Sequence, residues 1–204
     1  MMIIQLSIGL LGSNCYLIYD RDGGAGAVVD PGFREGQRLE AEIAKHNLTI
    51  RYILNTHGHF DHVAGNGRLD FPHAELGIHP ADRDLLMQGG GQIEVDSPPP
   101  ELDLLDNAEI SFGDLRLLVI HTPGHTPGSV SFYLPDHNAV LTGDTLFRGS
   151  VGRTDLPGGD LEQLRRSLRR LLSLPDETRV FPGHGPDTTI GRERGQNPWL
   201  RQLV

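Results

Sequence analysis

Cysteine and long apolar runs are scarce in this chain. Cys15 is the single cysteine in 204 residues, so no internal disulfide and no cysteine-rich zinc site can form. It lies in the strand-like run 14–19, where we expect a small buried hydrophobe. Segment 1–11 is apolar, but it lacks a basic leader and is much shorter than the roughly 20 residues of a membrane span. We therefore expect a cytoplasmic protein without a membrane partner.

Positive charge is also in short supply. The 18 Lys and Arg residues are outnumbered by 27 Asp and Glu residues, which gives a formal net charge of −9. Only segment 164–170 is basic, and its arginines recur at helical spacing, which favours a solvated helix face. Because nucleic-acid surfaces rely on clustered Lys and Arg, the composition argues against a nucleic-acid partner.

No Gly-x-Ser-x-Gly segment of the serine hydrolases is present, but residues 57–62 read His-Gly-His-Phe-Asp-His. No other stretch packs four metal-capable side chains into six positions. Imidazoles beside a carboxylate suit zinc, manganese or iron better than calcium or magnesium. The preceding run 51–55 is rich in strand formers, so the cluster should lie in a loop at a strand end. The pattern predicts a metal site there.

Three further candidate ligands follow short strands, each in a turn with glycine or proline. His125 follows the strand expected at 115–120, and Asp144 and His184 occupy the same place after later strands. We therefore expect all three to converge on one edge of a layered sheet. His121 lies where its strand ends and is interpreted as a supporting or structural residue. The other histidines match no metal motif and are expected at the surface or in packing: His46, His73, His79 and His137.

The chain resembles the metallo-β-lactamase superfamily in the order and approximate spacing of four segments. These are HGHFDH at 57–62, PGHT at 123–126, GDT at 143–145 and PGHG at 182–185. Within the superfamily, run 143–155 is similar to the glyoxalase II (hydroxyacylglutathione hydrolase) and persulfide dioxygenase branch. The resemblance covers about residues 2–190. It implies an α/β fold, the four-layer αββα sandwich, as a single domain over 1–204.

The resemblance also implies a binuclear centre of two divalent metal ions, zinc by preference, with iron or manganese as alternatives. The first ion would be held by His57, His59 and His125, the second by Asp61, His62 and His184, and Asp144 would bridge them. We expect Asp61 and Asp144 to be catalytic as well. Two such ions sharing a water lower its pKa from about 15.7 towards about 7, which yields a hydroxide nucleophile.

Several functions remain open at this stage. We expect a glyoxalase II-like hydrolase of S-lactoylglutathione or a related acyl thioester, a small-molecule substrate. Glyoxalase II proper has a helical C-terminal domain, whereas only 20 residues follow His184 here. The second hypothesis is a persulfide dioxygenase with one iron held by His57, His125 and Asp144. A lactonase is a weaker third.

Arginines after the bridging aspartate are the candidate substrate ligands. The resemblance implies that Arg153 binds a glutathione carboxylate, with Arg148 as a helper. A guanidinium suits this role because its planar fork can bind a carboxylate through two hydrogen bonds. The structural alternative is an ion pair of Arg153 with Asp155 or Asp160.

Periodicity predicts the elements that carry these residues. Helices are expected at 35–46, 81–88 and 160–172, and strands at 2–8, 14–19, 26–29, 51–54, 74–78, several between 108 and 142, and 179–181. The glycine- and proline-rich segment 88–100 is either a lid over the metal site or an ordinary surface loop.

Overall fold

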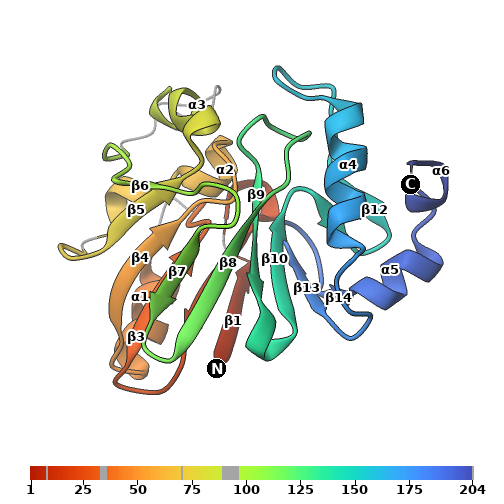
Figure 1. Ribbon diagram of the computed structural model, residues 1–204. Coiled ribbons are helices and arrows are strands. Elements are labelled where there is room, and N and C mark those ends of the chain that lie inside the picture. The colour runs from red at the N-terminus through yellow and green to blue at the C-terminus, as the bar shows by residue number, and fades with distance from the viewer. Residues whose placement is uncertain (8, 33–35, 70, 89–96, 204) are drawn as a thin grey trace.

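The computed structural model describes residues 1–7, 9–32, 36–69, 71–88 and 97–203. It contains two six-stranded sheets that pack face to face (Figure 1). The first sheet runs in chain order: β1 (Met2–Ser7), β2 (Asn14–Tyr19), β3 (Ala25–Val29), β4 (Thr49–Leu54), β5 (Glu75–Ile78) and β6 (Leu102–Asp103). Its first three strands pair antiparallel, and β3 to β6 pair in parallel.

The second sheet is mostly antiparallel. Its order is β14 (Thr188–Thr189), β13 (Arg179–Pro182), β10 (Ala139–Gly143), β9 (Val130–Leu134), β8 (Leu115–His121) and β7 (Glu109–Phe112). Only β10 and β13 pair in parallel. A small hairpin of β11 (Leu146–Phe147) and β12 (Ser150–Val151) follows β10.

Strand β2 shows why the sheets are stacked in this way. All six of its residues are buried, because both of its faces are covered. Tyr16 and Ile18 join the core between the sheets, with Phe112, Leu117 and Phe132 of the second sheet. Cys15, Leu17 and Tyr19 point to the other face and belong to a separate cluster. A strand covered on both sides reads as a continuous apolar run, as it does here.

Helices cover the two outer faces. Helix α1 (Gln37–Lys45) places Leu39 and Ile43 on the first sheet. Helix α4 (Leu161–Leu171) and helix α5 (Ile190–Gln196) cover the second sheet with an apolar stripe. The stripe consists of Leu164, Leu168, Leu171 and Ile190. The resulting layers confirm the predicted αββα sandwich.

Shorter helices complete the described part of the chain: α2 (Phe60–Val63), α3 (Arg83–Met87), α6 (Leu200–Leu203), and the 3-10 turns η1 (Leu10–Gly12), η2 (Asn66–Arg68), η3 (Pro80–Asp82) and η5 (Pro135–His137). No helix among the described residues is long and apolar enough to cross a bilayer.

The predicted elements are confirmed with small shifts at their ends. The expected helix at 81–88 divides into η3 and α3, and the strand expected at 115–120 extends to His121. The sequence analysis missed the short strands β6, β11, β12 and β14, since two residues show no periodicity. Of the segment 88–100, residues 89–96 lie outside the described residues, so the surface loop and the lid both stay as alternatives from the sequence.

Candidate metal centre

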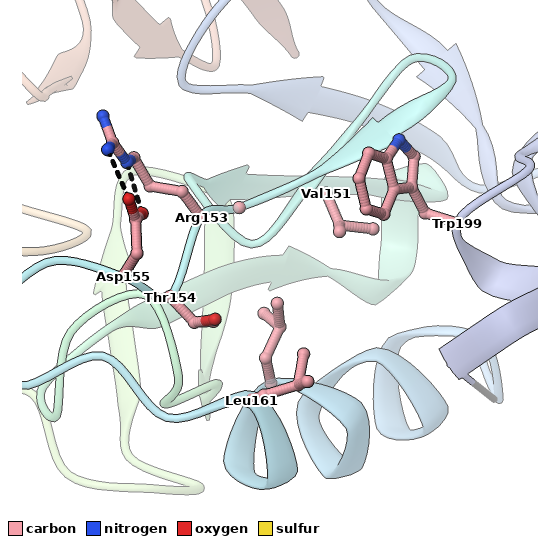
Figure 2. Close-up of a pocket in the computed structure, with 8 residues that line it drawn as sticks. Val151, Arg153, Thr154, Asp155, Leu161 and Trp199 are labelled. Atoms are coloured by element: carbon pink, nitrogen blue, oxygen red, sulfur yellow. Dashed lines mark hydrogen bonds and ion pairs between the residues drawn. The ribbon is translucent and has the colours of Figure 1, made fainter.

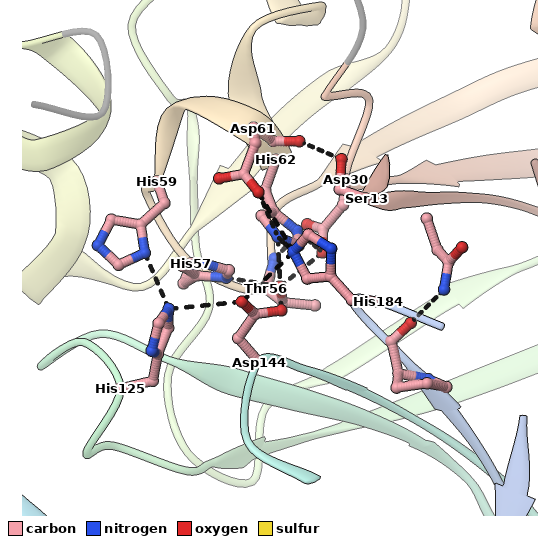
Figure 3. A network of polar contacts seen from close by, with 12 residues as sticks. Ser13, Asp30, Thr56, His57, His59, Asp61, His62, His125, Asp144 and His184 are labelled. Carbon is pink, nitrogen blue, oxygen red and sulfur yellow. Dashed lines mark hydrogen bonds and ion pairs between the residues drawn. The ribbon is translucent and has the colours of Figure 1, made fainter. Parts of the chain in front are cut away.

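Seven side chains proposed as metal ligands come together at the ends of four strands (Figure 3). The loop after β4 supplies the run 57–62, and the loop after β8 supplies His125. Asp144 follows β10 and His184 follows β13. Strand ends that meet at one edge of a sandwich bring together residues far apart in the chain, which is the convergence expected from the sequence.

The first cluster consists of three imidazoles. One nitrogen each of His57, His59 and His125 lies within 4.8 Å of the other two. The Nδ1 atom of His59 is 2.9 Å from Nε2 of His125. The ring of His57 lies edge-on to both neighbours, with centroid separations of 4.9 Å. These three nitrogens can supply three of the four positions in a tetrahedral shell of metal ligands.

The second cluster has two imidazoles and a carboxylate. The Nε2 atoms of His62 and His184 are 3.4 Å apart. An Asp61 oxygen lies 3.2 Å from His184 Nε2 and 3.6 Å from His62 Nε2. The three ligand atoms lie within 4.8 Å of one another.

Asp144 lies between the two clusters. Its Oδ1 atom is 3.4 Å from His62 Nε2, and its Oδ2 atom is 3.6 Å from the Nε2 atoms of both His125 and His184. The carboxylate therefore faces both sets of ligands (Figure 3). Gly183 makes this approach feasible, because a Cβ atom there would lie only 2.1 Å from Asp144 Oδ1.

Two buried atoms test whether these residues fit metal ions. Among the described residues, His57 Nε2 and Asp144 Oδ1 are buried without a hydrogen-bond partner. A buried polar atom left without a partner costs about 1–3 kcal/mol, so native structures seldom retain one. A cation would pair with both atoms. The donor set of imidazole nitrogens and carboxylate oxygens suits zinc, iron or manganese, so the residues fit.

Burial and the neighbouring imidazoles favour the neutral forms of His57 and His59. Burial lowers the pKa of His57 well below its usual value, and the nearby imidazoles lower it further. Burial, followed by His125, lowers the pKa of His59 to about 4. Neutral imidazoles have the free lone pair that a metal ligand needs.

The second cluster has the opposite electrostatics. Burial alone would lower the pKa of His62, but the carboxylates of Asp144 and Asp30 outweigh it and raise this pKa to about 10. Burial works against the ionised form of Asp61, yet the hydrogen bond from His184 and the charge of His62 lower its pKa. The carboxylates thus create a negative site, which His62 neutralises with a proton and a cation can neutralise instead.

Asp30 supports the histidines and was missed by the sequence analysis. Its carboxylate accepts from Thr56 N at 2.7 Å, from Thr56 Oγ1 at 2.6 Å and from His62 Nδ1 at 2.9 Å. The Thr56 hydroxyl in turn accepts from His57 Nδ1 at 3.1 Å. These bonds fix which nitrogen of each ring faces the centre. The sequence feature that could have indicated Asp30 is its position directly after the strand predicted at 26–29.

Asp82 joins the two loops that carry the first cluster, and the sequence gives no sign of it. The carboxylate is fully buried and accepts from Gly58 N at 2.9 Å, between His57 and His59. It also accepts from Thr126 Oγ1 and Gly128 N, each at 2.6 Å, beside His125. Asp82 therefore sets the separation of the two loops.

The candidate substrate arginines differ in their placement. The backbone carbonyl of Arg153 accepts from His125 Nδ1 at 2.8 Å. Its guanidinium makes a bidentate pair with Asp155, two bonds of 2.7 Å, so the structural alternative is present. Arg148 is exposed in the turn between β11 and β12. Next to it, Phe147 lies edge-on to His184 at 6.2 Å, a contact the sequence did not indicate.

His121 has structural contacts, in agreement with one of the two roles, supporting or structural, that the sequence suggested. Its Nε2 atom donates to the Pro127 carbonyl at 2.9 Å, and its ring stacks on His79 with centroids 4.1 Å apart.

Comparison with known proteins places this centre in a family. Residues 8–184 match the family model of the metallo-beta-lactamase superfamily. A probable metallo-hydrolase of Bacillus subtilis, YqgX, is 38% identical, with 96% of both chains covered. The hydroxyacylglutathione hydrolase GloC of Haemophilus influenzae is also 38% identical, with 92% of both chains covered.

Solved structures show the same fold. The B3 metallo-beta-lactamase BLEG-1 superposes with a TM-score of 0.89 at 34% identity, covering 98% of this chain and 99% of that one. TTHA1623, solved in a di-iron-bound form, has a TM-score of 0.84 at 41% identity, with 98% and 100% covered. ETHE1 from Myxococcus xanthus has a TM-score of 0.81 at 30% identity, with 99% and 85% covered.

Proposed function

The chain belongs to the metallo-beta-lactamase superfamily of metal-dependent hydrolases, and on this premise we propose that it hydrolyses acyl thioesters as glyoxalase II does. The proposed substrate is S-lactoylglutathione or a related thioester. The observation that carries the proposal is the pair of complete ligand clusters with Asp144 between them. The likeness to GloC, a hydroxyacylglutathione hydrolase, supports the substrate class.

We assign His57, His59 and His125 to one divalent cation, Asp61, His62 and His184 to a second, and Asp144 to both. Bound there, two such cations supply an activated water and polarise the thioester carbonyl. TTHA1623 was solved with two irons, which supports a binuclear centre; zinc and manganese suit the same donors.

The chain's own residues position these ligands. Asp30 and Thr56 orient the rings of His62 and His57, and the Arg153 carbonyl orients His125. Each ring donates from Nδ1, so its Nε2 atom carries the lone pair towards the centre. Asp61 and Asp144 are the two carboxylates that face the imidazoles of the site, and they would lie beside a water held there.

A thioester is the bond that this arrangement cleaves most readily. The leaving thiol has a pKa near 8.5, so it departs as a thiolate without a proton donor. A lactam or amide requires protonation of the departing nitrogen. We therefore rank thioesters first.

The alternative is a dioxygenase with one iron held by His57, His125 and Asp144. The structural likeness to ETHE1 is compatible with this alternative, which came from the resemblance to the glyoxalase II and persulfide dioxygenase branch. The second cluster favours the hydrolase, because a mononuclear iron enzyme has no use for Asp61, His62 and His184 together.

A parallel assay tests the proposal. Purified protein supplied with zinc, manganese or iron should cleave S-lactoylglutathione equally well in air and under nitrogen, and metal analysis should approach two ions per chain. Uptake of oxygen with glutathione persulfide, without thioester cleavage, would establish the alternative. Asp144→Asn provides the matched inactive variant, since it weakens a ligand of both ions while keeping the shape of the side chain.

A further inference from the structure

A second cavity lies beside the candidate metal centre. Its volume is about 420 Å³, within the range of small-molecule sites. The lining is mainly apolar, from Val151, Leu161, Leu164 and Trp199, and the segment Gly152–Asp155 completes it. Figure 2 shows Arg153 and Asp155 at one end of the cavity and Trp199 with Val151 at the other.

The cavity and the metal centre share a wall. The carbonyl of Arg153, a lining residue, accepts the hydrogen bond from His125 Nδ1. A Cβ atom on Gly152 would lie 3.4 Å from the Cβ atom of His125, so no side chain separates them. Arg153 therefore borders the cavity and also contacts a proposed metal ligand.

Two of the four apolar lining residues are open to water. Trp199 is 50% exposed and Leu161 is 42% exposed, although both stand around a concave space. Apolar side chains around a cavity gain stability when an apolar group displaces water from it. The Arg153–Asp155 pair at the polar end is 61% and 67% exposed, and an exposed pair contributes little to stability. The arginine can therefore be redirected to a ligand at small cost.

We propose that this cavity binds an apolar group on the thiol half of the substrate, beside an anionic group bound by Arg153. The inference rests on the proposed thioester hydrolysis and narrows its substrate class. The thiol is amphipathic, with a carboxylate or similar anion and an apolar group of the size of an aromatic ring. Glutathione has the anionic group but no apolar group of this size, so it leaves the apolar cavity unfilled.

Two thioesters that differ only in this group provide the test. S-lactoyl-N-acetylcysteine and S-lactoyl-N-(phenylacetyl)cysteine have the same acyl group, sulfur and carboxylate. We expect the phenylacetyl compound to have a kcat/KM about tenfold higher, mostly through KM, because a ring is removed from water. Equal kcat/KM values overturn the proposal.

A charge placed in the lining should abolish this preference. Leu161 is the first residue of α4, where an acidic side chain is compatible with the helix dipole, so Leu161→Asp should fold. The ratio of the two kcat/KM values should fall towards one. Leu105→Asp changes another exposed leucine outside the cavity, 53% exposed, and should keep the wild-type ratio. A ratio unaffected by Leu161→Asp counts against the cavity.

Binding can also be measured without turnover. Trp199 is the only tryptophan of the chain, so its fluorescence reports on this cavity alone. The thioether S-methyl-N-(phenylacetyl)cysteine should shift the emission to shorter wavelength in a saturable way, and S-methyl-N-acetylcysteine should not. If neither thioester is hydrolysed but this shift occurs, the proposed function fails and the cavity stands. Hydrolysis without a preference or a shift overturns the cavity and leaves the proposed function intact.

Discussion

The role of a buried carboxylate in this protein depends on the groups that face it. Asp144 has a buried oxygen without a partner and faces two sets of imidazoles. Asp30 and Asp82 are more deeply buried, but backbone, hydroxyl and imidazole donors satisfy their oxygens. A carboxylate with satisfied oxygens organises its neighbours, whereas one with a free oxygen is available to a cation.

Replacing Asp82 should weaken the first cluster without touching a ligand. Asp82→Asn keeps the shape, but its amide group must face one of the donors Gly58 N, Thr126 Oγ1 or Gly128 N. We expect the loops to separate slightly and the affinity of one metal ion to fall about tenfold, as for other supporting residues of metal sites. Competition with a chromophoric chelator measures this.

The exposed Asp103→Asn, which changes a carboxylate paired with Arg83, should leave both affinities unchanged. Equal affinities in Asp82→Asn and the wild type would show that the loops keep their separation without Asp82.

Replacing Arg153 and replacing Asp155 should change KM in opposite directions. If Arg153 binds the substrate anion, Arg153→Ala should raise KM about tenfold with little change in kcat, since the contact is distant from the reacting carbonyl. Asp155→Asn removes the competing carboxylate, 2.7 Å away, and should lower KM. Steady-state kinetics with S-lactoylglutathione check both. An unchanged KM in both variants would leave the ion pair as the sole role of the Arg153 guanidinium.

At the scale of elements, the ends of helices tie the outer layer to the loops of the site. The basic face predicted for 164–170 is partly solvated, but Arg170 departs from that prediction. Its guanidinium donates to Asp106 at 2.7 Å and to Asn107 Oδ1 at 3.2 Å, which joins α4 to the loop before β7. Helical spacing showed which side of α4 carries the arginines, but not that a loop lies against it.

Glu193 performs a similar function for α5. It is 1% exposed and accepts from Gly149 N at 2.7 Å, Thr188 Oγ1 at 2.6 Å and Asn197 Nδ2 at 2.9 Å. The helix is thereby bound to the turn of the β11–β12 hairpin and to β14.

Removal of this carboxylate should destabilise the protein. Glu193→Ala leaves buried donors without an acceptor, so we expect a loss of about 2 kcal/mol in the free energy of unfolding. Urea denaturation measures it. The exposed Glu177→Ala should stay within about 0.5 kcal/mol of the wild type. If both variants are equally stable, α5 is held by its apolar contacts alone.

At the scale of the whole molecule, stability should depend on pH through His79. Burial, and then the stacked His121, lower the pKa of His79 below 6.5. Its Nδ1 atom also accepts from Ala81 N at 3.2 Å, a bond that protonation removes. The unfolded chain therefore binds this proton more readily. Its contribution to stability is complete above about pH 6.5 and is lost as the pH falls below that value.

A variant without the titrating ring isolates this effect. Asparagine at position 79 can still cap the 3-10 turn but cannot be protonated, so His79→Asn should lose less stability than the wild type between pH 7.5 and pH 5.5. Chemical denaturation in the presence of a chelator at both pH values measures the difference. The same loss in the two proteins would mean that His79 is not protonated preferentially in the unfolded state.

The sequence alone indicated the helices and strands, and its resemblance to the metallo-beta-lactamase superfamily implied the layers and the proposed ligands of the candidate centre. Apolar residues at helical or strand spacing fix which face of each element is buried, and this is a local property. The proposed ligands also stand at positions that the sequence marks. Four of them are packed into 57–62, and His125, Asp144 and His184 stand in marked turns directly after strands.

Tertiary structure decided what surrounds those ligands. Asp82 and Gly128 are 46 positions apart, and no local pattern signals that a carboxylate accepts from that distant amide. The choice of Asp155 over Asp160 as the partner of Arg153 depended on how the loop turns. The apolar cavity formed only when β12, the start of α4 and Trp199 were brought together. Periodicity records which way a side chain faces, but the partner it meets depends on the packing of distant segments.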